Sequence, residues 1–279
     1  MSAPRIRGSH LGGSPDLPPL VVGPSLGTSV AALWSGVARR LADVYHVIGW
    51  DLPGHGASPR PSDAFTIEDL AASVIKVVEG KIGRRPFTYA GVSVAGAVGL
   101  QLLLGHPERI VSAALICTAA RLGDPDDWQS RAKVVRSAGT GEVVALSIRR
   151  WFAPGFFERD PASARALLDT LRRADDDGYA RTCEALADFD ARHRLGEIDT
   201  PIVAVAGAND TATPPDSLRY IASNVTRGRF IEVAHAAHLA PAEQPDRIAD
   251  VLAKLRRVGV PPGDDAGRKT ARGRGRQSR

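Results

Sequence analysis

Three residues that lie far apart in the chain, Ser93, Asp210 and His238, have the types and the order of a nucleophile, an orienting acid and a base. Ser93 lies in Gly91-Val92-Ser93-Val94-Ala95-Gly96, after a short apolar run and before a small-residue helical pattern. A serine hydroxyl is a poor nucleophile until a base takes its proton, and the base needs its tautomer fixed. The pattern therefore predicts acyl transfer by a Ser-His-Asp mechanism.

The segment around Ser93 indicates a sharp turn between a strand and a helix, in which residues two positions to either side must be small. Gly91 meets this requirement, whereas Ala95 stands where glycine is usual and its methyl group crowds the turn. A tight turn without catalysis is the alternative interpretation of this motif alone. The strand-turn-helix context favours a nucleophile elbow, with Ser93 at a helix N-terminus where developing negative charge is stabilised.

Asp210 and His238 each follow an apolar, strand-like run, at residues 202–206 and 229–233. Parallel strands bring their carboxyl ends to one edge of a sheet, where open α/β sheets bind ligands. Asp210 as a simple turn residue is one alternative, and His235 as the base is another. We favour His238 because His235 directly follows the strand.

The oxyanion of an acyl-transfer intermediate needs two main-chain N–H donors. We predict Val94, the residue after the nucleophile, and Leu26, in the Gly- and Pro-containing loop at residues 23–28. His55, between Gly54 and Gly56, is expected to support a turn. The sequence shows no His-Glu-x-x-His, Cys-x-x-Cys or phosphate-binding glycine motif, so we expect neither a metal nor a cofactor.

The elements that must position these residues follow from the hydrophobic pattern. Apolar runs without polar alternation predict buried parallel strands, and amphipathic stretches between them predict helices. This alternation favours a doubly wound, mostly parallel α/β sheet. One helix is expected at residues 67–82, with Thr66 as N-cap and Asp69 three residues on. The predicted strands lie within residues 20–22, 44–50, 87–90, 110–118, 202–206 and 229–233.

The alternation stops between residues 121 and 196, where four amphipathic helical segments follow one another at 128–138, 142–152, 161–174 and 179–189. We interpret this insertion as a helical lid on a core formed by residues 19–120 and 197–258. Extra helical packing is the alternative. Residues 1–18 and the basic tail 259–279 lack a periodic apolar pattern and are predicted to be disordered.

The net charge of +5 belongs to the C-terminal end of the 279-residue chain. Residues 256–279 contain eight Lys or Arg and two Asp, which leaves 28 basic and 29 acidic residues in the other 255. This balance argues against a nucleic-acid-binding face on the core. We expect no membrane span, no signal peptide and, with only two cysteines, a cytoplasmic protein whose partner is a small molecule.

Four segments together resemble the α/β-hydrolase superfamily over about residues 20–256: the Ser93 motif, and residues 53–58, 206–215 and 237–245. More narrowly, the chain is similar to the 3-oxoadipate enol-lactonases of bacterial aromatic catabolism. The residues that carry this narrower resemblance are 25–28, 149–154 and 178–186.

The resemblance implies a carboxylic-ester hydrolase with Ser93, Asp210 and His238 as its triad, which opens 3-oxoadipate enol-lactone to 3-oxoadipate. It also implies that the substrate enters under the lid. Ala95 departs from the family pattern, and so does Pro24-Ser25, where many relatives have His-Gly. The short N-terminal part implies that the first edge strands of the family's usual sheet are reduced or absent.

The carboxylate of such a lactone needs a positive partner, and we predict Arg150, beside Trp151 as an apolar wall. A solvated helix charge and plain packing are the alternatives for these two residues. A general carboxylesterase or cofactor-free haloperoxidase-like hydrolase, a non-catalytic receptor of the same fold, and a tail-mediated binder of acidic partners remain alternative functions. The sequence does not determine the oligomeric state.

Overall fold

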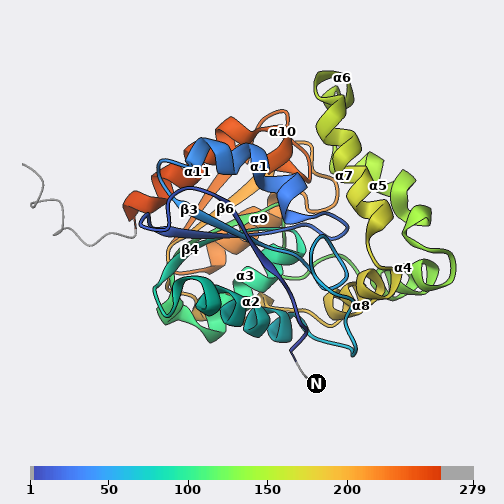
Figure 1. The fold of residues 1–279 in the computed structure, drawn as a ribbon, viewed down its shortest axis with the longest axis horizontal. Helices are drawn as coiled ribbons and strands as arrows, with labels where there is room; N and C mark the ends of the chain where they lie inside the picture. Colours follow the sequence, from blue (N-terminus) through green and yellow to red (C-terminus); the bar gives the residue numbers. More distant parts are fainter. Residues whose placement is uncertain (1–2, 259–279) are drawn as a thin grey trace, which may run out of the picture.

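A seven-stranded sheet in the order β1-β3-β2-β4-β5-β6-β7 forms the centre of the computed structural model, which describes residues 3–258 (Figure 1). Strands β2 to β7 pair in parallel, and β1 pairs antiparallel with β3. The predicted mostly parallel sheet is therefore confirmed. The strands are β1 (Gly8–Gly12), β2 (Pro19–Gly23), β3 (His46–Trp50), β4 (Phe87–Val92), β5 (Ile110–Ile116), β6 (Ile202–Gly207) and β7 (Gly228–Val233).

Helices cover both faces of this sheet, which explains why β2, β3, β4 and β6 are buried at every residue. On one face α1 (Val30–Leu41) packs against α11 (Pro245–Val258), and on the other α2 (Ile67–Ile82) packs against α3 (Val94–Gly105) (Figure 1). Beside β6 and β7 lies α9 (Pro215–Asn224), and α10 (Ala240–Glu243) precedes α11.

Helix α2 forms where its apolar spacing predicted it, and its start has the expected capping box. Thr66 Oγ1 accepts the Asp69 N–H at 3.0 Å, and the Thr66 N–H donates to Asp69 Oδ2 at 3.0 Å. This reciprocal pair satisfies two N–H groups that a helix start otherwise leaves without partners. Within residues 3–258, none of the helices combines the length and the apolar character that crossing a membrane requires.

The prediction that residues 1–18 are disordered is wrong for residues 3–18, because this segment forms the edge strand β1. The main chain of Arg7 accepts the Asp51 N–H at 3.1 Å and donates to Ser58 Oγ at 2.9 Å. Ser73 Oγ donates to the Pro4 carbonyl at 2.7 Å. Main-chain pairing to β3 fixes this strand. Residues 8–12 can therefore form a strand without an alternating apolar pattern. The predicted disorder of residues 1–2 and 259–279 lies outside the described residues.

Between β5 and β6 the chain forms the helical insertion, residues 121–196, which lies beyond one end of the sheet (Figure 1). Each of the four predicted helical segments overlaps a helix of the structure. Within the insertion, α4 and α8 pack closely against each other. The helices of the insertion are α4 (Pro125–Ala138), α5 (Val144–Trp151), α6 (Phe156–Arg159), α7 (Pro161–Arg173) and α8 (Asp176–Ala187). Short 3-10 turns lie at Thr140–Val143 and Arg192–Glu197, and another, Pro107–Arg109, lies before β5.

Candidate active site

Ser93 lies at the turn between β4 and α3 in a conformation that L-residues rarely adopt, with φ 57° and ψ −118°. Hydrogen bonds fix the main chain at this turn: the Ser93 N–H donates to Ile116 O at 3.0 Å, and Thr118 Oγ1 donates to Ser93 O at 2.7 Å. Strained residues of this kind persist only where the surrounding structure determines them, and they gather at functional sites. The Ser93 side chain lines a pocket at the N-terminus of α3.

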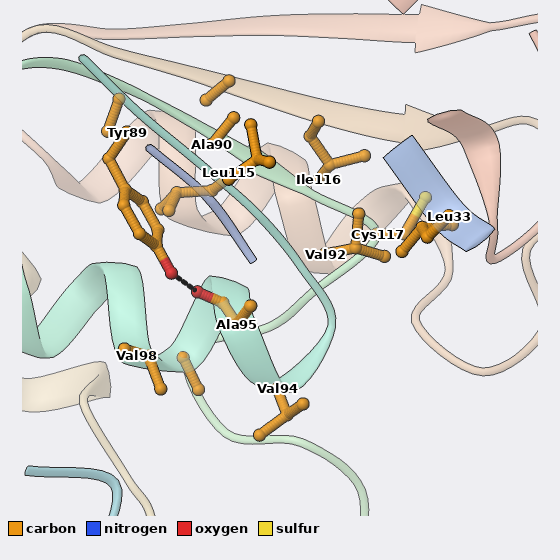
Figure 2. Packing of buried hydrophobic residues seen from close by; sticks show 14 of the residues in the cluster. Leu33, Tyr89, Ala90, Val92, Val94, Ala95, Val98, Leu115, Ile116 and Cys117 are labelled. Carbon is orange, nitrogen blue, oxygen red and sulfur yellow. Dashed lines mark hydrogen bonds between the residues drawn. The ribbon is translucent and has the colours of Figure 1, made fainter. Parts of the chain in front are cut away.

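The space around this turn explains how Ala95 replaces the glycine that the motif usually has. A Cβ on Gly91 would lie 2.2 Å from the Ala95 carbonyl oxygen, so position 91 requires glycine. A Cβ on Gly23, in the neighbouring strand β2, would lie 2.6 Å from the Ala95 Cβ. Gly23 therefore leaves the room that the Ala95 methyl group occupies. Figure 2 shows the Tyr89 hydroxyl pointing to the Ala95 carbonyl, to which it donates at 2.8 Å.

Asp210 and His238 meet at the carboxyl edge of the sheet, although 28 residues separate them. His238 Nδ1 lies 2.9 Å from Asp210 Oδ2, and both side chains are buried. Asp210 Oδ1 accepts the N–H groups of Ala212 at 2.8 Å and Thr213 at 3.0 Å. The carboxylate is thus fixed by the loop after β6 and can orient the imidazole with its proton on Nδ1.

Thr213 is a member of this network that the sequence analysis missed. Its hydroxyl donates to Asp210 Oδ2 at 2.7 Å and lies 3.4 Å from His238 Nδ1. A threonine three residues after an aspartate in a turn is a local hydrogen-bonding pattern that could have indicated it.

The environment of Asp210 favours its charged form. Burial raises its pKa, but the positive charge that His238 can carry, together with the hydrogen bonds from His238 and Thr213, outweighs burial, so the pKa is lowered. The alternative base, His235, is exposed and does not line the pocket. His238 therefore lines the pocket, and the carboxylate hydrogen-bonded to it is suited to stabilise an imidazolium.

Ser93 and His238 line the same pocket, but the structure does not join them by a hydrogen bond. Among residues 3–258, the hydrogen bond within the triad is the one between Asp210 and His238. Catalytic hydrogen bonds are often long without substrate and shorten in the Michaelis complex. Ser93 and His238 thus line one pocket, and Asp210, hydrogen-bonded to His238, orients the base.

The two predicted oxyanion donors belong to segments next to Ser93 and at its pocket. Val94 is the first residue of α3, where main-chain N–H groups lack partners in the helix, and Leu26 lines the pocket. Within the described part of the chain, the Leu26 N–H has no main-chain acceptor. Thr28 fixes the Leu26 loop, because its hydroxyl accepts the Ser25 N–H at 3.1 Å and donates to Ser25 O at 2.9 Å.

The pocket has a volume of about 90 Å³. The helical insertion supplies much of its wall. The lining residues are Ser25, Leu26, Ser93, Leu122, Gly123, Asp124, Asp127, Trp128, Arg131, Leu146, Ser147, Arg150, Trp151, Tyr179, Ala212, Thr213 and His238.

Two arginines line this pocket, the predicted Arg150 and a second, Arg131, which the sequence analysis missed. Arg131 lies over the Trp128 ring, 4.9 Å from its centroid. Burial raises the pKa of Tyr179, and the charges of Arg131 and Arg150 offset this in part. Neither arginine forms an ion pair with a carboxylate among residues 3–258. The Trp-x-x-Arg spacing, which places both residues on one side of α4, was the signal available in the sequence.

Trp151, the predicted apolar wall, is buried at the end of α5 and contacts the pocket. Its ring lies edge-on to Phe152, with centroids 6.1 Å apart, and its six-membered ring lies near Gly27. Both predicted roles, packing and lining the pocket, are therefore visible for this residue. In the part of the chain that the structure describes, no three His, Cys, Asp or Glu side chains gather as a metal site would require.

The chain is similar to known proteins in sequence and in structure. A family model described as the alpha/beta hydrolase fold matches residues 18–245. The chain is 34% identical to 3-oxoadipate enol-lactonase 2 of Acinetobacter baylyi over 84% of its length and 86% of the relative's. It is 28% identical to a pimeloyl-[acyl-carrier protein] methyl ester esterase of Neisseria meningitidis, over 74% of its length and 81% of the relative's.

Among solved structures, the fold is similar to that of an enol-lactonase from Burkholderia xenovorans LB400. The TM-score is 0.84 and the sequence identity 28%, with 90% of this chain and 96% of the other covered.

Proposed function

The chain belongs to the alpha/beta hydrolase fold family, and from that premise we propose that it is a serine hydrolase that opens 3-oxoadipate enol-lactone to 3-oxoadipate. The observation that carries this proposal is that His238, hydrogen-bonded to the buried Asp210, lines one pocket with Ser93 and with two arginines that form no ion pair among residues 3–258. The similarity to an enol-lactonase over 84% of the chain supports the same substrate class.

In the proposed reaction, His238 takes the proton of the Ser93 hydroxyl while the Ser93 oxygen forms a bond to the lactone carbonyl carbon. The main-chain N–H groups of Leu26 and Val94 stabilise the oxyanion, and such a donor typically contributes about 3–4 kcal/mol. The bond from the carbonyl carbon to the ring oxygen then breaks. The ring oxygen leaves as an enolate, which is a better leaving group than an ordinary alkoxide.

The second half of the reaction returns the enzyme to its starting state. The enolate takes up the proton that His238 holds and becomes a ketone, which returns the imidazole to its neutral form and disfavours closure of the ring. His238 then takes a proton from water while the water oxygen attacks the acyl-enzyme carbonyl. The ester bond to Ser93 breaks, the Ser93 oxygen takes that proton back from His238, and a second carboxylate is released. Asp210 stabilises the imidazolium in both halves, in agreement with its lowered pKa.

We assign the free carboxylate of the lactone to the two pocket arginines. A guanidinium can bind a carboxylate through two parallel N–H donors. Arg150 is exposed at the pocket, and Arg131 is partly buried and positioned by Trp128. Trp151 supplies an apolar wall, and the helical insertion acts as the lid under which the substrate enters. Free, buried Cys117 and Cys183 are consistent with a cytoplasmic enzyme.

Turnover of the purified protein on 3-oxoadipate enol-lactone, measured beside p-nitrophenyl acetate, tests the proposal. We expect a higher kcat/KM on the lactone, and a loss of several orders of magnitude in kcat for Ser93→Ala. Faster turnover of simple aryl esters would contradict the lactonase assignment. A Ser93→Ala variant with full biological function would instead indicate a non-catalytic receptor.

Simple ester hydrolysis is the second candidate function, because the chain is also similar to a methyl ester esterase at 28% identity. The two candidates differ in what the arginines do. An enol-lactonase needs them to bind a free carboxylate, whereas an esterase acting on uncharged esters does not. A panel that compares a carboxylate-bearing lactone with its methyl ester therefore separates the two functions.

A further inference from the structure

A buried carboxylate outside the triad, Glu243, joins two separate parts of the active site. Glu243 is the last residue of α10 and is 4% exposed. Its Oε1 accepts the Ala153 N–H at 2.6 Å, and its Oε2 accepts the Ala237 N–H. Ala153 belongs to the helical insertion, two residues after Trp151, and Ala237 directly precedes His238. One side chain therefore connects the pocket wall to the loop that carries the base.

A third hydrogen bond completes the connection on the other side of His238. The Leu239 N–H donates to the Trp151 carbonyl at 3.2 Å. The main chain is thus fixed to the insertion both before and after His238. We call these three bonds, from Ala153 N and Ala237 N to Glu243 and from Leu239 N to Trp151 O, the Glu243 clasp.

The chemical choice of a carboxylate at position 243 needs a reason, because burying a charge is costly unless it is hydrogen-bonded. Burial raises the pKa of Glu243, while the two main-chain N–H groups favour the charged form. A carboxylate can accept both N–H groups, one on each oxygen, whereas an amide has a single acceptor oxygen. The geometry fits two donors that arrive from different segments of the chain.

We propose that Glu243 is a positioning residue that fixes the His238 loop to the substrate-facing end of α5, so that the alignment of the base depends on the position of the Arg150–Trp151 wall. The proposal rests on the proposed role of His238 as the general base. It does not depend on which ester or lactone is the substrate. Glu243 itself does not line the pocket, so it acts through its neighbours.

The first test is Glu243→Gln, which preserves the shape of the side chain but leaves one of the two N–H groups facing an amide NH₂ group. We expect kcat on p-nitrophenyl acetate, normalised by active-site titration, to fall about 10- to 100-fold, as a misplacement of about 1 Å does. KM should change little because the pocket wall remains. The matched control is Glu232→Gln, an exposed glutamate paired with Arg219, which should retain the wild-type kcat.

A second readout separates positioning from a loss of stability. The proton between His238 Nδ1 and Asp210 is expected to give a ¹H resonance far downfield, and its shift reports the geometry of that pair. We expect this resonance to shift or broaden in folded Glu243→Gln and to stay unchanged in Glu232→Gln. A folded Glu243→Gln protein with wild-type kcat and an unchanged resonance overturns the proposal.

Ala153→Pro tests the hydrogen bond between Ala153 and Glu243 from the side of the insertion. This variant provides the test if Glu243→Gln does not fold. It removes the N–H that donates to Glu243 Oε1, and the extended Phe152 before it, with φ −118° and ψ 135°, suits a residue that precedes proline. We expect a lower kcat with the Glu243–Ala237 bond intact. Wild-type kcat in this variant overturns the coupling to the insertion. If the wild-type protein hydrolyses no ester, the proposed function fails, and the His238 resonance still tests the clasp.

Discussion

Replacing Asp210 by asparagine changes one atom of the site, and the structure indicates how the change reaches the nucleophile. Asp210 Oδ1 accepts two main-chain N–H groups, while Oδ2 accepts the Thr213 hydroxyl and His238 Nδ1. The main-chain donors cannot rotate, so the asparagine oxygen should take the Oδ1 position and its NH₂ group should face His238. The imidazole then accepts at Nδ1 and carries its proton on Nε2, where it cannot take the proton of Ser93.

The expected magnitude follows from the loss of the correct tautomer. The corresponding change in another Ser-His-Asp enzyme lowers kcat by about 10⁴-fold, which equals about 5.5 kcal/mol at about 1.36 kcal/mol for each tenfold. The fold should persist, because the Thr213 hydroxyl can rotate to accept from the new NH₂ group. Steady-state kcat on p-nitrophenyl acetate, with the amount of folded protein determined by circular dichroism, measures the effect.

The matched control is Asp169→Asn, at a half-exposed position on α7 where the carboxylate pairs with Arg172. Its kcat should equal that of the wild type. A folded Asp210→Asn variant that loses less than tenfold in kcat would refute the reasoning, because it would show that this carboxylate does not set the tautomer of His238. A large loss of folded protein in the variant would show up separately, as a lower circular dichroism signal.

Substitutions at three other positions test separate parts of the structure. Gly23→Ala should lower the free energy of unfolding by about 1–3 kcal/mol, because the added Cβ lies 2.6 Å from the Ala95 Cβ and 2.7 Å from Trp50; adding Ala95→Gly should restore part of the loss in a denaturant titration, and no restoration would contradict the account of the turn. Burial lowers the pKa of His55 from 6.5 to about 4. Between these pH values the unfolded chain binds a proton at His55 that the folded chain does not bind. Stability should therefore fall by about 3 kcal/mol as the pH drops from 6.5 to 4, and His55→Gln should flatten that dependence; parallel curves would disprove it. Arg131→Met should lower kcat/KM on the carboxylate-bearing lactone about 10- to 100-fold and leave the methyl ester unaffected; equal losses on both would indicate a packing role.

The strands and helices that carry the site were predictable, because their signals are local. Apolar runs marked β2 to β7, and Thr66 with Asp69 marked the start of α2. Strand β1 was not predictable from composition, since residues 8–12 pair through their main chain with an edge that lies about 40 residues away. The sequence predicted that this segment is disordered, and the structure contradicts that prediction.

The same distinction between local signals and long-range contacts applies to the residues of the candidate site. Ser93 and His238 were found because a turn and a chain order mark them in the sequence. Arg131 and Glu243 were missed because each looks like an ordinary helix charge until the segments it faces are known. The distance of 2.9 Å between Asp210 and His238 could not come from spacing alone.

The sequence by itself determined the chemistry available to this protein: a hydroxyl, an imidazole and a carboxylate, each at the end of an apolar strand, and the alternating pattern that makes the sheet. Only the tertiary structure decided how these groups meet, that Gly23 makes room for Ala95, and that Glu243 joins the insertion to the His238 loop. The physical reason is that periodicity and turn chemistry act between neighbours in the chain, whereas hydrogen bonds and close contacts depend on distances between segments that only the packed fold brings together.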